Sequence, residues 1–335
     1  MTVPAPLAIS LGDPAGIGPE LIAEAWARRE AERLPAFFAN GGAEVLAAAA
    51  KRRGIDLPVV PIVDVAEATA AFARGIPVLT DYDAEYRPGE PDEQGARFAI
   101  ASLVEACARA IGGEAGAIVT GPIAKAHLAR FGFTQPGQTE FVADACGTAR
   151  EDAVMMLAGP SLRTVPLTVH TALANVPGLI TTDLVLRRVR IVAASLARDF
   201  GLPRARIAVT GLNPHAGEEG RMGEEDRREI APAVALLREE GLDVTGPHPA
   251  DALFAASQRS GFDVAVCMYH DQALIPIKTL DFDHGVNVTL GLPIVRTSPD
   301  HGTAFAIAGT GSASAGATIA AIRMAGECAA RRATE

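Results

Sequence analysis

Short runs rich in valine, isoleucine and leucine alternate along the chain with longer segments in which apolar residues recur every three or four positions. Buried strands connected by amphipathic helices produce this alternation. The pattern therefore predicts an α/β fold with a mostly parallel sheet. Strands are expected at 6–11, 59–63, 117–120, 153–157, 164–169, 207–210, 264–268 and 286–290.

Three segments have the clearest helical period, and they predict helices at 92–111, 182–200 and 317–330. The second of these helices begins with threonine and aspartate near its positive end and stops before Gly201, as capping preferences favour. The third is rich in alanine, which indicates packing against other helices. The stretch 82–91 contains proline and glycine and is typical of a loop inside a domain.

Composition places the chain among globular proteins. Its 335 residues are 49% hydrophobic and 21% charged, which is enough for about two domains of roughly 150 residues each and excludes a disordered or fibrous protein. The 40 acidic and 30 basic residues give a formal charge of -10, and such a field repels nucleic acid and anionic membranes. An anionic substrate would need a local cluster of donors.

The four cysteines, at 107, 146, 267 and 328, are too far apart for a CxxC pair and favour a reducing compartment. The first ten residues contain no basic residue of a signal peptide, and no apolar run reaches the roughly 18 residues of a membrane span. We expect a soluble cytoplasmic protein without nucleic-acid or membrane partners.

Three of the seven histidines, His170, His215 and His270, each follow a predicted strand. Ligands in α/β sheets bind beyond the carboxyl ends of strands, so these imidazoles could converge on one divalent ion such as zinc, cobalt, nickel or iron. Alternatively, each histidine satisfies a buried carbonyl or caps a loop. Asp251 and Asp271 could orient or supplement the ligands, or could be a helix cap and a solvated turn.

A second group, Lys278, Asn287 and Arg296, stands in a stretch otherwise poor in positive charge. The lysine offers a point charge, the asparagine a neutral donor and the arginine a bidentate guanidinium, and together these groups suit a phosphate or carboxylate. Surface charges and turn residues are the alternative interpretation.

Three glycine-rich segments, 12–20, 120–122 and 302–311, match neither GxGxxG nor a P-loop. The first opens a helix with proline in its first turn, where exposed amides and the helix dipole could hold an anion. A tight turn between strand and helix is the alternative.

Taken in order, these motifs resemble the 4-hydroxythreonine-4-phosphate dehydrogenase family of pyridoxal phosphate biosynthesis. The resemblance covers nearly the whole chain and rests on Gly12–Glu20, Thr120–Pro122, Gly137–Phe141, His170, Asn213–Glu218, Pro249–Asp251, Tyr269–Gln272, Asn287–Thr289 and Arg296–Ala304.

The resemblance implies a metal-dependent, NAD- or NADP-linked oxidation of 4-phosphooxy-L-threonine, followed by loss of carbon dioxide to give 3-amino-2-oxopropyl phosphate. The metal ligands would be His170, His215 and His270, holding zinc or else magnesium, cobalt, nickel or manganese. The phosphorylated substrate would contact Gln138, Thr139, Lys278, Asn287 and Arg296. Lys278 and Asp251 are the candidate catalytic residues.

The same resemblance implies a fold like that of isocitrate and isopropylmalate dehydrogenases, with two α/β/α domains around a cleft. The first domain is expected to contain residues 1–128 and 298–335, and the second 129–297. The nucleotide loop would use Asp300, His301, Gly302, Thr303, Ala304 and Gly309. A homodimer with the active site at the subunit interface is also implied.

One departure from the family pattern concerns the substrate. Family members usually have Gly-His-Thr-Glu where this chain has Gly137-Gln138-Thr139-Glu140, so a neutral amide replaces an imidazole. Threonate or erythronate 4-phosphate, or a dihydrodiol, are therefore alternative substrates, although Lys278, Asn287 and Arg296 favour a phosphorylated acid. A lesser departure is Ala306, where an aspartate often stands in the nucleotide loop.

Two rivals come from other functional classes. Phosphate acetyltransferases resemble this fold, but acyl transfer would not need three metal-binding histidines. A non-catalytic metal-binding protein would retain zinc without turnover.

Overall fold

The computed structural model describes residues 5–79 and 82–334. The chain divides into two compact units, Met1–Arg150 with Leu292–Glu335, and Glu151–Gly291. The first unit combines an earlier and a later segment of the chain, and it includes residues 129–150 and 292–297, which the sequence analysis assigns to the second domain. Residues 292–297 join this unit because the strand that starts at Arg296 pairs in parallel with the strand that contains Ile118.

A parallel sheet forms the centre of the first unit. Its strands are β1 (Leu7–Ser10), β2 (Phe37–Asn40), β3 (Val59–Ile62), β4 (Ile76–Leu79), β5 (Ile118–Thr120) and β12 (Arg296–Pro299). Their order is β3-β4-β2-β1-β5-β12, and every neighbouring pair is parallel. The carboxyl ends of β1, β5 and β12 therefore meet at one edge, where the three glycine-rich segments begin.

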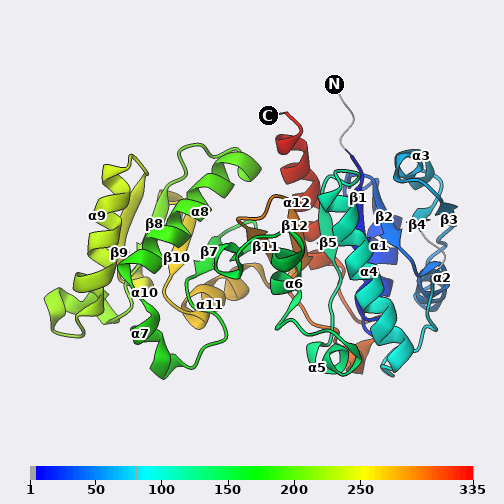
Figure 1. Ribbon diagram of the computed structural model, residues 1–335, viewed down its shortest axis with the longest axis horizontal. Helices are drawn as coiled ribbons and strands as arrows, with labels where there is room; N and C mark the ends of the chain where they lie inside the picture. The colour runs from blue at the N-terminus through cyan, green and yellow to red at the C-terminus, as the bar shows by residue number, and fades with distance from the viewer. Residues whose placement is uncertain (1–4, 80–81, 335) are drawn as a thin grey trace. The chain divides into compact units, whose positions relative to one another are not determined.

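The helices of the first unit are α1 (Gly18–Ala27), α2 (Ala43–Arg52), α3 (Ala68–Phe72), α4 (Glu93–Ile111), α5 (Lys125–Leu128), α6 (Gln138–Ala145) and α12 (Gly316–Arg332). Figure 1 shows α1 and α4 beside the blue strands and α12 in red near β12. The Asp92 carboxylate caps α4 by accepting a 2.7 Å hydrogen bond from the Gly95 amide. This cap explains why the apolar period of α4 begins where the sequence predicts.

The strands of the second unit are β6 (Val154–Ala158), β7 (Arg163–Pro166), β8 (Ile207–Thr210), β9 (Val244–His248), β10 (Val264–Cys267) and β11 (Val286–Leu290). Their order is β11-β6-β7-β10-β8-β9. Strand β6 is antiparallel to both of its neighbours, whereas the other neighbouring pairs are parallel. The prediction of an α/β fold with a mostly parallel sheet is confirmed.

The helices of the second unit are α7 (Val176–Leu179), α8 (Thr182–Phe200), α9 (Ala231–Glu239), α10 (Ala250–Leu253) and α11 (His270–Asp281). The Thr181 hydroxyl caps α8 by accepting a hydrogen bond from the Leu184 amide, and Gly201 ends the helix in the left-handed region with φ 65°. These caps place α8 at the residues predicted for it.

Four strands, β2, β4, β9 and β12, are absent from the sequence prediction. Strand β4 contains Pro77, and β9 contains Gly246 and Pro247, so neither has the composition of a typical strand. Strand β12 reads Arg-Thr-Ser-Pro yet is fully buried. Its polar side chains have partners, because the Thr297 hydroxyl donates to the Ala321 carbonyl at 2.9 Å and Arg296 belongs to the site described below.

None of the helices in residues 5–79 and 82–334 is long and apolar enough to cross a membrane.

Candidate active site

Three adjacent parallel strands of the second unit each lead into one of the candidate histidines. In the order β7-β10-β8, His170 follows β7, His270 follows β10 and His215 follows β8. Because parallel strands end at the same edge of a sheet, all three histidines are placed at that edge. The sequence analysis places the three histidines after three different strands, and in the structure these strands are neighbours.

Two of the histidines are close together. The ring centroids of His170 and His270 are 5.9 Å apart. The His270 ring is oriented by the Asp271 carboxylate, whose Oδ1 lies 2.7 Å from Nδ1. A carboxylate on one ring nitrogen is the usual second partner of a metal-binding imidazole, since it leaves Nε2 directed elsewhere.

Gln272 connects the start of α11 to the end of β8. Its Oε1 accepts hydrogen bonds from the Thr210 hydroxyl at 2.8 Å and the Met268 amide at 2.7 Å, and its Nε2 donates to the Gly211 carbonyl at 2.8 Å. This one side chain therefore fixes the segments that carry His270 and His215 relative to each other. In the sequence, Gln272 stands within a motif but has no predicted role.

The segment around His215 is held by Asp226, a residue that no sequence pattern identifies. Asp226 is buried, and its carboxylate accepts hydrogen bonds from the Leu212 amide at 2.8 Å, the Asn213 amide at 3.2 Å and the Asn213 side-chain nitrogen at 2.9 Å. His215 itself has φ 53°, in the left-handed region. A non-glycine residue in that region depends on such supporting contacts.

The residue types at the candidate metal site suit a transition metal, but the structure, over the residues that it describes, does not arrange three of them around one point. Imidazole nitrogen suits zinc, cobalt and nickel, and the His170–His270 pair with its oriented ring fits such an ion. Across residues 5–79 and 82–334, no group of three or more histidine, cysteine or acidic side chains is arranged to hold a metal. The three-histidine site therefore stays a prediction.

Three further candidate residues lie in the second unit. Lys278 lies on α11 and is half-buried, and Asn287 lies on β11 with its Oδ1 buried and without a hydrogen-bond partner. Asp251 is exposed on α10, a helix that contacts the segment 214–220 containing His215. The buried amide oxygen of Asn287 can accept a hydrogen bond from a ligand.

In the first unit, the structure brings Arg296, Gln138 and Thr139 together. The Arg296 guanidinium is 3% exposed, and its Nη2 donates to the Thr120 hydroxyl at 2.7 Å and to Gln138 Oε1 at 3.0 Å. Its Nη1 makes a longer contact of 3.5 Å with the Thr139 hydroxyl. Burial lowers the pKa of Arg296 to about 10, so the side chain still carries its charge at neutral pH.

Gln138, which departs from the family pattern, uses both ends of its amide. While Oε1 accepts from Arg296, Nε2 donates to the Gly121 carbonyl at 2.9 Å. Gln138 is the first residue of α6 and is buried. It therefore ties α6 to the carboxyl end of β5 and orients the guanidinium.

The expected nucleotide loop follows β12 and is fixed to α1 and α2. The Ile17 amide donates to the Thr303 carbonyl at 3.0 Å, the Gly309 amide donates to Glu20 at 3.3 Å, and Arg52 Nε donates to the Gly309 carbonyl at 2.7 Å. Ala304 has φ 45° in the left-handed region. These contacts hold the loop in one conformation.

His301 provides an open acceptor in this loop. Its Nδ1 lies 3.1 Å from the Gly302 carbonyl, whereas Nε2 is buried without a hydrogen-bond partner. Burial lowers the pKa of His301, so the neutral ring is favoured, with Nε2 as the acceptor. A nucleotide hydroxyl or amino group could supply the missing donor. Asp300, Gly302 and Thr303 complete this part of the loop.

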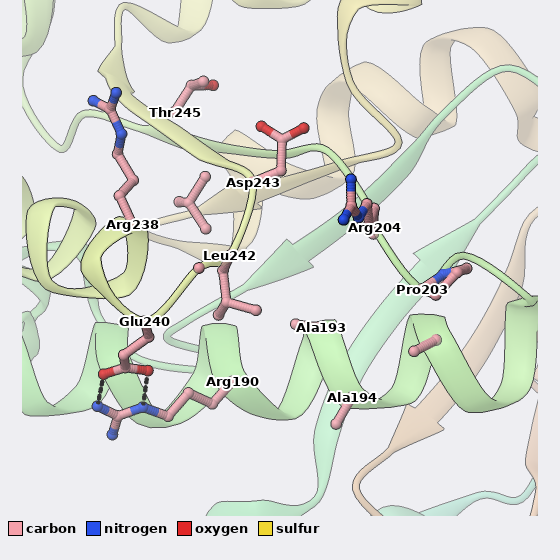
Figure 2. A pocket seen from close by; sticks show the side chains of 14 residues that line it. Arg190, Ala193, Ala194, Pro203, Arg204, Arg238, Glu240, Leu242, Asp243 and Thr245 are labelled. Atoms are coloured by element: carbon pink, nitrogen blue, oxygen red, sulfur yellow. Dashed lines mark hydrogen bonds and ion pairs between the residues drawn. The ribbon is translucent and has the colours of Figure 1, made fainter.

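A cavity of about 800 Å³ in the second unit lies elsewhere, between α8 and the segments that precede β8 and β9. Figure 2 shows the Glu240 carboxylate bound to Arg190 by two hydrogen bonds, whereas Arg204 lies on the other side of the pocket. This cavity lies at the amino ends of β8 and β9, whereas His215 follows the carboxyl end of β8. It is therefore separate from the candidate active site.

Comparisons with known proteins agree with the motifs. Residues 33–325 match the family model described as pyridoxal phosphate biosynthetic protein PdxA. A protein of Erythrobacter litoralis named 4-hydroxythreonine-4-phosphate dehydrogenase is 60% identical over 328 residues, which are 98% of each chain.

Solved structures are similar to this protein over nearly its whole length. The structure of 4-hydroxythreonine-4-phosphate dehydrogenase from Klebsiella pneumoniae has a TM-score of 0.85 and 37% identity, covering 97% of this chain and 98% of the other. A terephthalate 1,2-cis-dihydrodiol dehydrogenase from Burkholderia xenovorans has a TM-score of 0.65 and 28% identity, covering 96% and 98%. The predicted family resemblance is confirmed, and the chain belongs to the PdxA family of pyridoxal phosphate biosynthetic proteins.

Proposed function

We propose that this protein oxidises the secondary alcohol of 4-phosphooxy-L-threonine with NAD or NADP, and that the oxidised product loses carbon dioxide to give 3-amino-2-oxopropyl phosphate. The observation that carries the proposal is the buried Arg296 guanidinium, with neutral oxygen acceptors on Thr120, Gln138 and Thr139. It occurs in a chain 60% identical to a protein named for this activity.

The phosphate group of the substrate is the ligand that this arginine suits. In a protein of net charge -10, a buried cation supplies the local attraction that a dianion requires, and a guanidinium donates charge-assisted hydrogen bonds to phosphate oxygens. Thr139 adds a hydroxyl donor beside it. Lys278 and Asn287 of the second unit are the remaining residues assigned to the substrate.

The metal would be held by His170, His215 and His270, with zinc favoured and magnesium, cobalt, nickel or manganese as alternatives. When bound, a divalent cation lowers the pKa of a coordinated alcohol and stabilises negative charge on oxygen. Asp271 orients the His270 ring through Nδ1, and Gln272 holds the two strand ends at which His270 and His215 stand. These contacts are made between residues of the protein, so they hold the two histidines in place without a bound metal.

A bound nicotinamide cofactor would supply the acceptor for the hydride that leaves carbon 3 of the substrate, while a base of the protein takes the proton of the hydroxyl group. Lys278 is the proposed base, and Asp251 is the second candidate. The product is a β-keto acid, so the bond between carbon 2 and the carboxylate breaks as carbon dioxide leaves. A proton returned to carbon 2, for which Lys278 is again suited, completes the amino ketone phosphate.

The nucleotide would bind along the loop that includes Asp300, His301, Gly302, Thr303, Ala304 and Gly309. The support is the buried Nε2 of His301, which lacks a donor, and the fixed geometry of the loop against α1 and α2. Cytoplasmic location and a homodimer with the active site at the subunit interface complete the proposal. Sedimentation equilibrium tests the homodimer, because a monomer would contradict that assignment.

A dihydrodiol dehydrogenase is the second candidate function. It is favoured by the similarity to the Burkholderia xenovorans enzyme and by Gln138, a neutral amide where the family usually has histidine. A terephthalate dihydrodiol carries carboxylates but no phosphate, so it brings no dianion to the positive charge of the buried Arg296 guanidinium. Threonate and erythronate 4-phosphate would use that charge, and so they are closer alternatives.

A comparison of substrates tests the proposal. The ratio kcat/KM is measured with NAD for 4-phosphooxy-L-threonine, D-threonate 4-phosphate, D-erythronate 4-phosphate and a cis-dihydrodiol. We expect the highest value for 4-phosphooxy-L-threonine. A higher kcat/KM for another phosphorylated acid would retain the assignment as a dehydrogenase but change its substrate. A higher kcat/KM for the dihydrodiol would overturn the assignment of Arg296 to the phosphate.

A further inference from the structure

Asp13 is a buried acid to which the proposed function assigns no role. It lies in the segment between β1 and α1, with 0% of its surface exposed. Its Oδ1 accepts a 3.0 Å hydrogen bond from the Ala15 amide, but its Oδ2 is buried without a hydrogen-bond partner. A carboxylate oxygen in this state is costly for the fold, because it has lost water and gained no donor.

A second unsatisfied atom faces it. Nδ1 of His127, on α5, is also buried without a hydrogen-bond partner and lies 3.8 Å from Asp13 Oδ2. This distance is too long for a hydrogen bond. The His127 ring packs with its edge toward Phe131, at a centroid distance of 5.4 Å. The two residues thus present an acceptor and, with Nδ1 protonated, a donor side by side.

The pKa of Asp13 is consistent with an Oδ2 atom that lacks a hydrogen-bond donor. Burial raises the pKa of its carboxyl group, and this effect exceeds the opposing contributions of the Ala15 amide and His127. A ligand that donates a hydrogen bond to Oδ2 would relieve the cost of burial.

The segment that carries Asp13 contacts the proposed nucleotide loop and a residue next to Gly121. The Asp13 amide donates to the Pro122 carbonyl at 2.9 Å, one residue after the Gly121 carbonyl that accepts from Gln138. On the other side, a Cβ added to Gly16 would lie 2.9 Å from the Thr303 carbonyl. The segment carrying Asp13 therefore touches both the substrate region and the nucleotide loop.

The reactive end of a dinucleotide must reach from the nucleotide loop to the substrate, so its nicotinamide ring belongs where these two regions meet. We propose that Asp13 and His127 bind the carboxamide of that ring, with the amide nitrogen donating to Asp13 Oδ2 and the amide oxygen accepting from His127 Nδ1. A primary carboxamide carries a donor and an acceptor side by side, as this pair requires. The two contacts would fix which face of the ring meets the substrate. The inference rests on the proposed use of a nicotinamide cofactor.

Equilibrium binding separates this inference from the proposed function. Dissociation constants are measured by calorimetry for NAD, for ADP-ribose, which lacks the nicotinamide ring, and for 3-acetylpyridine adenine dinucleotide, in which a methyl group replaces the amide nitrogen. In the wild type we expect NAD to bind about tenfold more tightly than the acetyl analogue, as loss of a hydrogen bond to a charged group predicts.

The variant Asp13→Asn keeps an oxygen for the Ala15 amide but turns a donor toward the ligand. It should weaken NAD binding about tenfold, remove the preference over the acetyl analogue, and leave ADP-ribose binding unchanged. His127→Phe should also weaken NAD binding selectively, and His127→Asn, which retains a donor, should restore part of it. Should Asp13→Asn fail to fold, the two His127 variants decide the question.

Asp64→Asn is a matched control, because the exposed Asp64 accepts a 2.8 Å hydrogen bond from the Ala66 amide in the same local arrangement. It should change none of the three constants. Equal loss of NAD and ADP-ribose binding in Asp13→Asn, or no loss of either, would overturn the carboxamide assignment while leaving the cofactor in place. If the wild type bound neither these three compounds nor NADP, the nucleotide part of the proposed function would fail together with this inference.

Discussion

Gln138 and Arg296 form a 3.0 Å hydrogen bond between the amide oxygen of one and the guanidinium of the other. The other end of the Gln138 amide is bound to the Gly121 carbonyl, so the position of the guanidinium depends on this side chain. A residue that departs from the family pattern thus has a defined structural role, because it orients the positive charge.

Replacing Gln138 by alanine should raise KM for 4-phosphooxy-L-threonine about tenfold or more, because a hydrogen bond to a charged group is lost and Arg296 is less constrained. Steady-state kinetics measures the change. Gln138→His restores the residue usual in the family and should retain turnover. Gln94→Ala, an exposed glutamine in the first turn of α4, is the control, and a KM change equal to that of Gln138→Ala would contradict the assignment.

Substrate affinity should depend on the charge of Arg296. Its pKa is lowered to about 10 by burial, so the free protein carries this charge below about pH 10 and loses it above. Affinity for the phosphorylated substrate should therefore be nearly constant near neutral pH and fall as the pH rises through about 10. Calorimetry measures this, with circular dichroism confirming that the chain stays folded. Unchanged affinity at about pH 11 would exclude this role.

The three candidate metal ligands should act together. His170→Ala, His215→Ala and His270→Ala are each expected to lower the metal retained per chain after dialysis and to reduce turnover at least a hundredfold, because a ligand of the cation is removed. Elemental analysis gives the metal content. His284→Ala changes an exposed histidine and should retain both properties. Full metal content in two of the three ligand variants would refute a shared site.

Asp226 should support the metal site from a distance. Because its carboxylate accepts hydrogen bonds from Leu212 and Asn213, Asp226→Asn should lower the free energy of unfolding by about 1–3 kcal/mol. It should also weaken metal binding through His215. Thermal unfolding and metal titration are the measurements. A loss of stability with unchanged metal affinity would restrict Asp226 to a structural role.

The sequence predicts the fold well wherever apolar patterning decides the structure. The capped helices α4 and α8 and the strands β8 and β11 appear at the residues expected. Strand β12 was not predictable in this way, because Arg296 and Thr297 are polar and are buried only through partners distant in the sequence. Hydrophobic periodicity contains no information about such partners.

Some residues of the candidate site could be predicted from the sequence, and others could not. Histidines placed after strands were recognisable, because strand ends in an α/β sheet have a known meaning. The supporting residues Asp226 and Gln272 were not, since an acid or an amide in an irregular segment has the composition of a solvated loop. Asp13 stood in a recognised motif, but its unsatisfied Oδ2 becomes evident only when His127 is placed beside it.

The central claim is tested most directly by following NADH absorbance and labelled carbon dioxide together, with 4-phosphooxy-L-threonine labelled at the carboxylate as the substrate. The account predicts equal amounts of both products, loss of both after treatment with a chelator, and recovery of both when a divalent metal is returned. Absence of the reduced nucleotide from the metal-loaded protein with both NAD and NADP, or formation of the reduced nucleotide that a chelator leaves unchanged, would contradict it.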